Sequence, residues 1–278
     1  MDDVDIQIRG LTELEEFGQV VRIQKAVWGM EDIDITPAHH FDISVKTGAI
    51  LLGAFVGEEL AGYVYSFPAR SRSGWAQHSR QLGVLPRFRG KCIGRKLKWA
   101  QRKDAIEKGY SLITWTVDPL LSLNGRLNFF TLGAVTRTYL ADFYRAMPAL
   151  SVAPGVPADR LYLEWHLNSR RVEQCLADGR SRTAESFRQA LVRADGGWPQ
   201  PPGIPNLHLE DKILAVEIPR DIGRMTDNLS LVLAWQRAVR QTLEHYFSQG
   251  YWIDDFSQAG DRSYFILRLP EKGEWDGT

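Results

Sequence analysis

The chain has 278 residues, of which 44% are hydrophobic and 24% charged, and it carries no net formal charge. At about 150 residues per domain this length predicts one large domain or two ordinary ones. The composition excludes disordered, collagen-like and coiled-coil classes. The two cysteines, Cys92 and Cys175, are too few for a disulfide framework and lack the spacing of metal ligands. We therefore expect a reducing compartment and no metal site.

The first ten residues, MDDVDIQIRG, are acidic and lack the basic and apolar stretches of a secretory leader. No later segment reaches the ~18 consecutive apolar residues that a membrane span needs. A cytoplasmic location and no membrane partner are therefore expected.

The zero net charge hides a strong asymmetry along the chain. Residues 1–59 contain twelve acidic residues and four basic ones. Residues 60–103 contain no acid, but they contain Arg70, Arg72, Arg80, Arg87, Arg89, Lys91, Arg95, Lys96, Lys98, Arg102 and Lys103. Such an excess favours a polyanion or a phosphate-bearing small molecule. The alternative is a solvated helix face whose charge is neutralised by the acidic N-terminal third.

The first elements alternate between strand and helix. Residues 6–10 form a predicted strand, and Thr12 with Glu15 has the spacing of a capping box that starts a helix. Thr36 and Pro37 have the residue types of the N-cap and first position of a second helix. Two β-rich runs then surround Gly57-Glu58-Glu59, which predicts a hairpin.

A strand over residues 79–85, a helix over 91–108 and a strand over 111–117 follow, which is a βαβ pattern. The turn between the first strand and the helix reads Arg89-Gly90-Lys91-Cys92-Ile93-Gly94-Arg95. A phosphate needs backbone N–H groups from the first helical turn and small residues that let the main chain approach closely. This turn supplies both, together with positive side chains.

Residues 84–97, VLPRFRGKCIGRKL, resemble the acyl-CoA-binding motif of the GNAT (Gcn5-related) acetyltransferase superfamily, Val-x-Pro-x-x-Arg-Gly-x-Gly-Ile-Gly-x-x-Leu. One motif position departs, because Cys92 stands where the family has its central glycine. Because cysteine is small, we expect the turn to form still, provided that Cys92 has a negative φ. The order of elements also resembles GNAT over roughly residues 4–168.

The resemblance implies an α/β (α+β) fold, with a mixed sheet splayed between its fourth and fifth strands. It also implies acetyl-CoA or another acyl-CoA as co-substrate, and no metal. The residues that it assigns to the cofactor are Gly83, Val84, Arg89, Gly90, Lys91, Cys92, Ile93, Gly94, Arg95 and Asn124.

In the family an amine attacks the thioester directly, and a backbone N–H, here near Val84, polarises the thioester carbonyl. His78 lies at the expected start of the fourth strand, where the family's general base often lies, and a neutral imidazole is a competent base. Asp118 ends the fifth strand, where open α/β sheets place ligands. The alternatives are a solvated histidine and an Asp-Pro turn.

The family's general acid is a tyrosine after the fifth strand, but aligning Leu132-Gly133 puts Phe129 at that position. Tyr139 is the hydroxyl that we expect in its place, with Tyr144 as an alternative. Otherwise the thiolate leaves unaided or takes a proton from water, and both tyrosines are packing residues.

Strands are expected over residues 133–140 and 160–167, around a Pro-rich loop at 148–157 that is long enough to shape an acceptor site. A helix over 169–191 and a Gly/Pro-rich linker at 196–205 come next. The last part reads as an additional β-α-β-β module. The expected organisation is a GNAT domain over 1–168, a helix and linker over 169–205, and a C-terminal α+β module over 206–278.

Three functions follow in order of support. The first is acyl transfer to a small amine or amino acid, with succinyl as an alternative acyl group because Arg70, Arg72 or Arg80 suits a carboxylate. The second is a non-catalytic CoA-binding or regulatory protein, favoured by Cys92 and Phe129. Nucleic-acid binding ranks lowest, because no recognised motif accompanies the bases. A homodimer is one expected assembly. Most tryptophans are expected in the core, and Trp75 is expected to be exposed.

Overall fold

The computed structural model describes residues 5–72, 74–145, 151–178, 187–194 and 199–270. Parts of the loop expected at 148–157, of the helix expected at 169–191 and of the linker expected at 196–205 lie outside these residues. The chain divides into two compact units, and it passes from one to the other within a strand, after Trp115. The first unit holds residues 1–115 and 166–168, and the second holds 116–165 and 169–278. This grouping differs from the boundary expected at residue 168.

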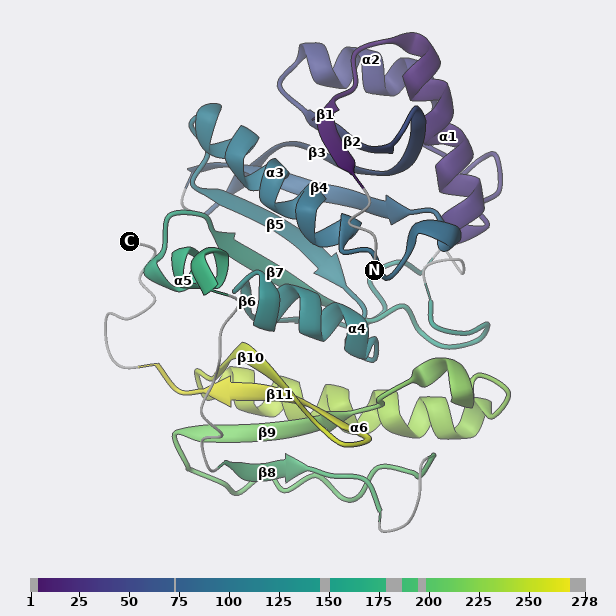
Figure 1. Cartoon of the computed structure of the whole chain (residues 1–278). Coiled ribbons are helices and arrows are strands. Elements are labelled where there is room, and N and C mark those ends of the chain that lie inside the picture. The colour runs from purple at the N-terminus through teal and green to yellow at the C-terminus, as the bar shows by residue number, and fades with distance from the viewer. Residues whose placement is uncertain (1–4, 73, 146–150, 179–186, 195–198, 271–278) are drawn as a thin grey trace. The chain divides into compact units, whose positions relative to one another are not determined.

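The first unit is built on a sheet in the order β1-β2-β3-β4-β5, which can be followed in Figure 1. Its strands are β1 (Ile6–Gly10), β2 (Ile50–Val56), β3 (Glu59–Ser71), β4 (Gly74–Val84) and β5 (Leu112–Val117). The first four strands pair antiparallel, whereas β4 and β5 pair in parallel. Such a parallel pair needs a crossover connection, and a helix supplies it here.

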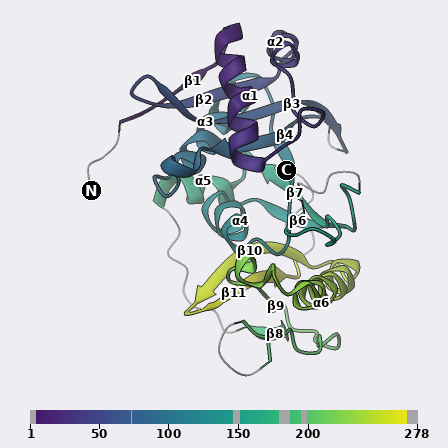
Figure 2. The same ribbon diagram turned by 90° about the vertical axis from the view of Figure 1, so that its right-hand side faces the viewer.

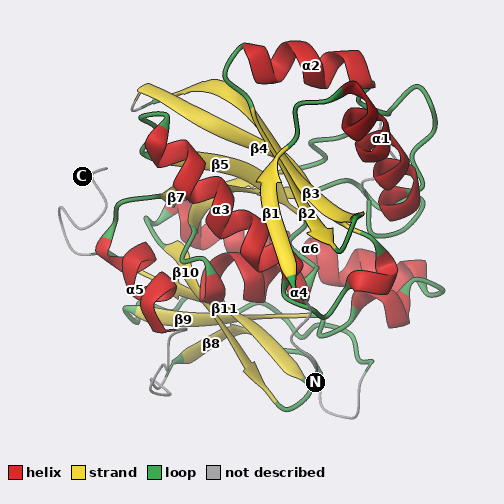
Figure 3. Ribbon diagram, turned by 45° about the horizontal axis from the view of Figure 1, so that its top comes forward, coloured by secondary structure: helices red, strands yellow, loops and turns green. Residues whose placement is uncertain are grey.

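Helices cover both faces of this sheet. One face packs on α1 (Leu14–Trp28) and α2 (Ala38–Lys46), with Phe17, Phe41 and Tyr65 in a shared apolar core. The other face packs on α3 (Ile93–Glu107), where Ile93 and Leu97 meet Ala61 and Val64 of β3. Figure 3 gives a view of α3 over the strands. The helical spacing of Ile93 and Leu97 explains why this face of α3 is buried.

The second unit carries a sheet in the order β7-β6-β10-β11-β9-β8. Its strands are β6 (Val135–Leu140), β7 (Arg160–His166), β8 (Arg188–Leu191), β9 (Ile213–Ile218), β10 (Trp252–Ala259) and β11 (Arg262–Arg268). Its helices are α4 (Ser122–Gly125), α5 (Arg170–Asp178) and α6 (Leu229–Ser248). The described residues also include the short helical segments η1 (Pro86–Phe88), η2 (Arg126–Thr131) and η4 (Ile222–Met225).

Figures 1 and 2 show α6 running beside the strands of the second unit. Val232, Trp235 and Val239 lie on its buried face. The expected β-α-β-β module is confirmed as β9, α6, β10 and β11. Its β10 pairs with β6 at Ile253 and Thr136, so the module shares a sheet with strands that were expected in the first domain.

The fold class is confirmed: it is mixed α/β, with both parallel and antiparallel strands and the extra C-terminal strands. The order of elements from β1 to β7 is the order expected from the GNAT resemblance. Trp115, Trp165, Trp235 and Trp252 are buried and Trp75 is 61% exposed, as expected. No helix among residues that the structure describes is long and apolar enough to cross a membrane.

Three local expectations were wrong. The first helix is capped one residue later than expected, because the backbone N–H of Glu13 donates to Glu16 Oε2 at 3.1 Å. The second helix has Pro37 itself as N-cap. The helix expected over 169–191 ends at Asp178, and residues 188–191 form strand β8 beside β9. A polar segment without clear periodicity gave no signal for that parallel pairing.

The second unit should not survive loss of its C-terminal strands. Truncation after Asp195 removes β9, α6, β10 and β11, and it takes Phe265 away from Phe129, whose ring it meets edge-on at 5.5 Å. Each large apolar side chain left exposed costs about 1.5–3 kcal/mol, against a total stability of about 5–15 kcal/mol. We expect the 1–195 fragment to aggregate in size-exclusion chromatography. A soluble monomer with cooperative unfolding would contradict the shared sheet.

Candidate active site

The turn between β4 and α3 leaves several backbone N–H groups without an acceptor inside the helix. The first half of the turn is held by two backbone hydrogen bonds between residues three apart, from Phe88 N–H to the Leu85 carbonyl at 2.9 Å and from Arg89 N–H to the Pro86 carbonyl at 3.2 Å. The helix begins at Ile93, and its first internal bond from the cap runs from Lys96 N–H to the Cys92 carbonyl. The first three helical N–H groups therefore have no acceptor within the helix. The side chain of Cys92, the N-cap residue, does not cap them either.

Cys92 has φ +58° and ψ +13°, so the expectation of a negative φ was wrong. The left-handed conformation places Cβ too close to the carbonyl oxygen and costs about 1–2 kcal/mol for any residue but glycine. The turn thus keeps the shape that a glycine would favour at this position. Gly90, two residues earlier, also has a positive φ of +80°.

Neither the backbone conformation nor the packing of the fold requires a glycine at position 94. Its φ lies in the ordinary helical range, and a Cβ added there would meet only Leu82 at 3.8 Å, an ordinary contact. Glycine in a helix destabilises it by about 0.5–1 kcal/mol relative to alanine. A glycine that neither the backbone nor the packing requires fits a position at which a ligand approaches the main chain.

The basic side chains around the turn are exposed. Arg89, Lys91 and Arg95 all face solvent, and Arg89 is steadied by a bond from its Nε to the Val84 carbonyl at 3.3 Å. Lys91 lies 5.6 Å from the centre of the Phe88 ring. Arg87 differs, because it forms an ion pair with Glu59 of β3. The turn therefore combines N–H groups that have no acceptor within the helix, little steric bulk and positive charge.

Beside the turn, β4 and β5 form a fork, whose two strands lie side by side in Figure 1. Their recorded pairing in the first unit consists of Gln77 with Ile113 and His78 with Thr114. From Ser79 onward no pairing with β5 is recorded in this part of the chain. That edge of β4 is thus available to bond to something other than a strand.

A β-bulge lies at the same point. Tyr65 of β3 pairs with Gln81, whereas Ser66 pairs with Ser79, so Arg80 is the extra residue on β4. A bulge leaves its extra residue unpaired and bends the strand, and bulges are frequent next to active sites. Arg80 is exposed, and its charge acts on Tyr65 and on His78. Sequence reasoning missed this bulge, because no residue pattern marks it.

His78 lies within β4 and not at its start, because the strand begins at Gly74. Its Nδ1 is 3.0 Å from the Thr114 hydroxyl, and its ring packs 5.5 Å from that of Phe67. Burial lowers the pKa of His78 below its usual 6.5, and the charges of Arg80 and Lys98 lower it further. The imidazole is consequently neutral at pH 7, which is the form that a general base requires.

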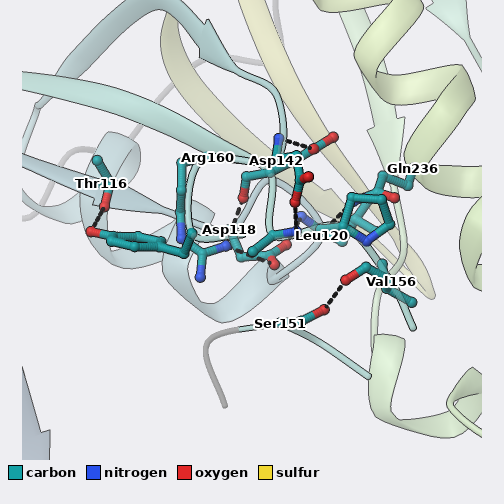
Figure 4. A network of polar contacts seen from close by, with 12 residues as sticks. Thr116, Asp118, Leu120, Asp142, Ser151, Val156, Arg160 and Gln236 are labelled. Atoms are coloured by element: carbon teal, nitrogen blue, oxygen red, sulfur yellow. Dashed lines mark hydrogen bonds and ion pairs between the residues drawn. The ribbon is translucent and has the colours of Figure 1, made fainter. Parts of the chain in front are cut away.

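Asp118 belongs to the second unit, where it forms a buried ion pair. Its Oδ1 accepts the Leu120 N–H at 2.9 Å, and its Oδ2 accepts from Arg160 at 3.2 Å (Figure 4). Burial raises the pKa of Asp118 to about 6, although Arg160 opposes the shift. These two bonds occupy both carboxylate oxygens. The bond from Leu120 N–H to Asp118 is the one expected of an Asp-Pro turn, so that alternative is confirmed. An additional contact between Asp118 and a substrate stays a prediction.

Tyr139 also has a protein partner. Its hydroxyl donates to Asp159 Oδ2 at 2.5 Å. Arg240 of α6 donates to the same carboxylate, from Nε to Oδ2 at 2.9 Å and from Nη2 to Oδ1 at 2.5 Å. Burial and the Asp159 charge raise the pKa of Tyr139 far above its usual value. Tyr144 bonds to Thr116 at 3.1 Å, near the Arg160 guanidinium (Figure 4). Asp159, Arg160 and Arg240 were not anticipated, because their partners are distant in sequence.

The residues expected after the fifth strand lie on one helical segment. Asn124 is in α4, which continues directly into η2, a stretch of π-helix from Arg126 to Thr131. Such π segments are rare and are frequently found at functional sites. Phe129 is fully buried within the second unit. The side chain at the family's tyrosine position is therefore a core residue here.

His78, Gly83, Val84 and the turn thus all belong to the first unit, whereas Asp118, Asn124 and Tyr139 belong to the second. Lys98 of α3 was missed as a site candidate, since a lysine in a basic run gives no sign that it is buried. Within the described ranges no group of three or more His, Cys, Asp or Glu side chains is arranged to hold a metal.

No protein-family model matches the chain, and no curated protein matches it. Solved structures do match, among them an aminoglycoside acetyltransferase from an uncultured soil metagenomic sample in complex with sisomicin. It is 21% identical, covers 41% of this chain and 78% of its own, and has a TM-score of 0.38.

Two further structures cover more of the chain. An acetyltransferase of the GNAT family from Streptococcus pneumoniae is 14% identical over 58% of this chain and 98% of its own, with a TM-score of 0.47. The PaiA N-acetyltransferase from Thermoplasma acidophilum in complex with coenzyme A is 16% identical over 58% and 99%, with a TM-score of 0.43. At these values the likeness decides neither activity nor substrate.

Replacing Cys92 by glycine should stabilise the first unit. The substitution relieves the left-handed strain of about 1–2 kcal/mol but adds backbone entropy to the unfolded chain, so we expect a net gain of about 1 kcal/mol. Denaturant unfolding measures it. Cys92→Ala is the control, because it removes the thiol and keeps the strained Cβ. An equal gain in both variants would show that strain is not the cause.

Proposed function

We propose that the protein is an acyl-CoA-dependent N-acyltransferase that acts on a small amine or amino acid, with the pyrophosphate of the cofactor bound by the turn at residues 89–95. The main evidence for this proposal is Gly94. The fold does not require glycine at this position, whereas a ligand that approaches the main chain does. The N–H groups of the first α3 turn, which have no acceptor within the helix, and the exposed Arg89, Lys91 and Arg95 supply the complement to a pyrophosphate.

The β4 edge beyond His78 is the proposed seat of the acyl group. A chain that runs from the turn along β4 passes the unpaired edge from Val84 back to Ser79. A backbone N–H at the bulge can donate to the thioester oxygen as negative charge develops on it. We therefore place the polarising donor nearer to Arg80 than to Val84.

The proposed reaction needs no nucleophile from the protein. The amine nitrogen forms a bond to the thioester carbon, the carbon–sulfur bond breaks, and the electron pair leaves with sulfur as the CoA thiolate. The amine must lose a proton, and His78 is the proposed acceptor, because it is neutral and lies at the fork. Water is the proposed proton donor to the thiolate, because the Tyr139 hydroxyl donates to Asp159 and Phe129 is a buried core residue without a hydroxyl.

A carboxylated acyl group such as succinyl is a second candidate, and Arg80 favours it. The bulge exposes this guanidinium next to the proposed acyl seat, and no ion pair with Arg80 is recorded among the described residues. Guanidinium groups suit planar carboxylates. A carboxylate on an amino-acid acceptor would use the same charge. Acetyl-CoA remains the simplest donor.

The test is thiol release from a panel of acyl-CoAs in the presence of amines and amino acids. Release with at least one pair is expected, and comparison of acetyl-CoA with succinyl-CoA decides between the acyl groups. Tight CoA binding without turnover on any amine would instead establish the non-catalytic function, which the strained Cys92 and the buried Phe129 favour.

Replacing Gly94 by valine should weaken CoA binding by at least about tenfold, or ~1.4 kcal/mol, because the added side chain occupies the path to the amides. Isothermal titration calorimetry measures the dissociation constant. Gly18→Val is the matched control: Gly18 is also helical, in α1, and an added Cβ there meets nothing within 4 Å. Unchanged CoA affinity in the Gly94 variant would overturn the assignment of the turn.

Replacing His78 by glutamine should lower the rate at neutral pH by about a hundredfold, the usual contribution of a general base. The CoA dissociation constant should stay nearly unchanged, because His78 lies away from the turn. In the wild type kcat/KM should rise with pH through a midpoint below 6.5, as the imidazole loses its proton, and then level off. If kcat/KM of the His78→Gln variant rises with pH through the same midpoint as in the wild type, His78 is not the general base.

A further inference from the structure

A buried lysine lies at the fork of β4 and β5. Lys98 of α3 is only 2% exposed, and its Nζ is 3.8 Å from the centre of the Trp115 ring. The same ammonium donates to Ser79 Oγ at 3.3 Å. Ser79 and Trp115 directly follow His78 and Thr114, the last recorded pair of the two strands. One cation thus contacts the first residue beyond the pairing on each side of the fork.

Packing alone does not explain a charge at this position. Lysine loses water contacts when it is buried, which is unfavourable unless hydrogen bonds and a partner replace them. Ile93 and Leu97 fill the neighbouring positions of the same helix face with apolar atoms. A methionine would fill the space of Lys98 without that loss. Burial lowers the pKa of Lys98 to about 7, because the site disfavours the charged form of the side chain.

The polar contacts of Lys98 are arranged to fix Ser79. Lys98 Nζ donates to Gln101 Oε1 at 2.8 Å, and Gln101 Nε2 is 3.2 Å from Ser79 Oγ. The three side chains form a closed triangle, and Gln101 is fully buried. Ser79 immediately precedes the bulged residue Arg80. Its side chain is therefore held at the point where β4 leaves β5 and bends.

We propose that Lys98 is a positioning residue that sets the opening of the β4–β5 fork by holding Ser79 and Trp115, the first residue of each strand beyond the β4–β5 pairing. This role rests on the proposed function in one respect: the fork is where that function seats the acyl group. Lys98 acts there through Ser79 and the adjoining bulge.

The charged groups around Lys98 are few. On β4 they are His78 and Arg80, and the pKa of His78 is lowered by the Lys98 charge. The four β5 residues of the first unit, LITW, carry no titratable side chain. On α3 the positions one turn away hold Arg95 and Arg102. Each of these groups is cationic or titrates to a cation.

The first test follows the Trp115 ring without any assay of activity. The protein is labelled with 5-fluorotryptophan, and the Trp115 resonance is assigned by its loss in Trp115→Phe. We expect this ¹⁹F resonance to titrate near pH 7 in the wild type and not to titrate in Lys98→Met. Lys103→Met is the matched control, because Lys103 is exposed on the same helix. A wild-type titration in Lys98→Met would overturn the assignment.

His78 also titrates near the fork, so the labelled protein is measured with His78→Gln as well. That variant should keep the Trp115 titration if Lys98 is its source. Lys98→Met itself should fold, because replacing a buried charge by an apolar side chain is often neutral or stabilising.

The second test measures the fork itself by amide hydrogen exchange over residues 78–82. We expect exchange to accelerate by about tenfold in Lys98→Met, since the triangle on Ser79 is lost, and to stay unchanged in Lys103→Met. Unchanged exchange in Lys98→Met would overturn the proposal.

Activity separates this role from a merely structural one. Lys98→Met should lower kcat by about tenfold and change the CoA dissociation constant by less than about twofold, because the turn is untouched. A wild-type kcat in that variant would overturn the positioning role. If the wild type transfers no acyl group at all, the proposed function fails, while the fluorine and exchange measurements still decide whether Lys98 sets the fork.

Discussion

The early end of the pairing between β4 and β5 is the constraint on which the first unit's chemistry depends. A parallel pair normally continues its ladder along both strands, but here the recorded pairs are those of Gln77 and His78. The bulge at Arg80 bends β4 at the next step, and the buried ammonium of Lys98 occupies the opening. An edge that pairs with no strand keeps backbone donors and acceptors for a ligand, which an uninterrupted sheet could not offer.

The turn and the fold order could be predicted because their signals are local. Glycines and a helix start within seven residues define the turn, and alternating strand and helix patterns define the order β1 to β5. Boundaries were less certain: β4 begins at Gly74, so His78 lies inside the strand. Cys92 adopted a glycine-like φ because its neighbours on both sides fix the turn, a tertiary effect that overrides the preference of one residue.

The contacts that sequence reasoning missed join residues far apart in the chain. Asp118 pairs with Arg160, Asp159 with Arg240, and β6 with β10, each across more than forty intervening residues. No composition or spacing rule links such partners, and a buried ion pair needs both to be present. The same reasoning explains the changed boundary: strands 135–140 and 160–166 look like the end of one domain in sequence, yet their sheet is completed by four strands that begin at residue 188 or later.

The basic run of residues 60–103 serves three different purposes in the structure, which resolves the two interpretations of its charge. Arg87 pairs with an acid of the first third, Glu59, as the solvated-face interpretation expects. Lys98 is buried in the fork, where its charge faces an aromatic ring and amide and hydroxyl oxygens. Arg89, Lys91 and Arg95 are exposed around helix N–H groups that have no acceptor within the helix. Within the first third, Glu16 pairs with Arg9 and Asp32 with Lys25, so these acids are neutralised by bases of their own segment. The exposed positive charge at the turn is what the proposed anionic ligand would use.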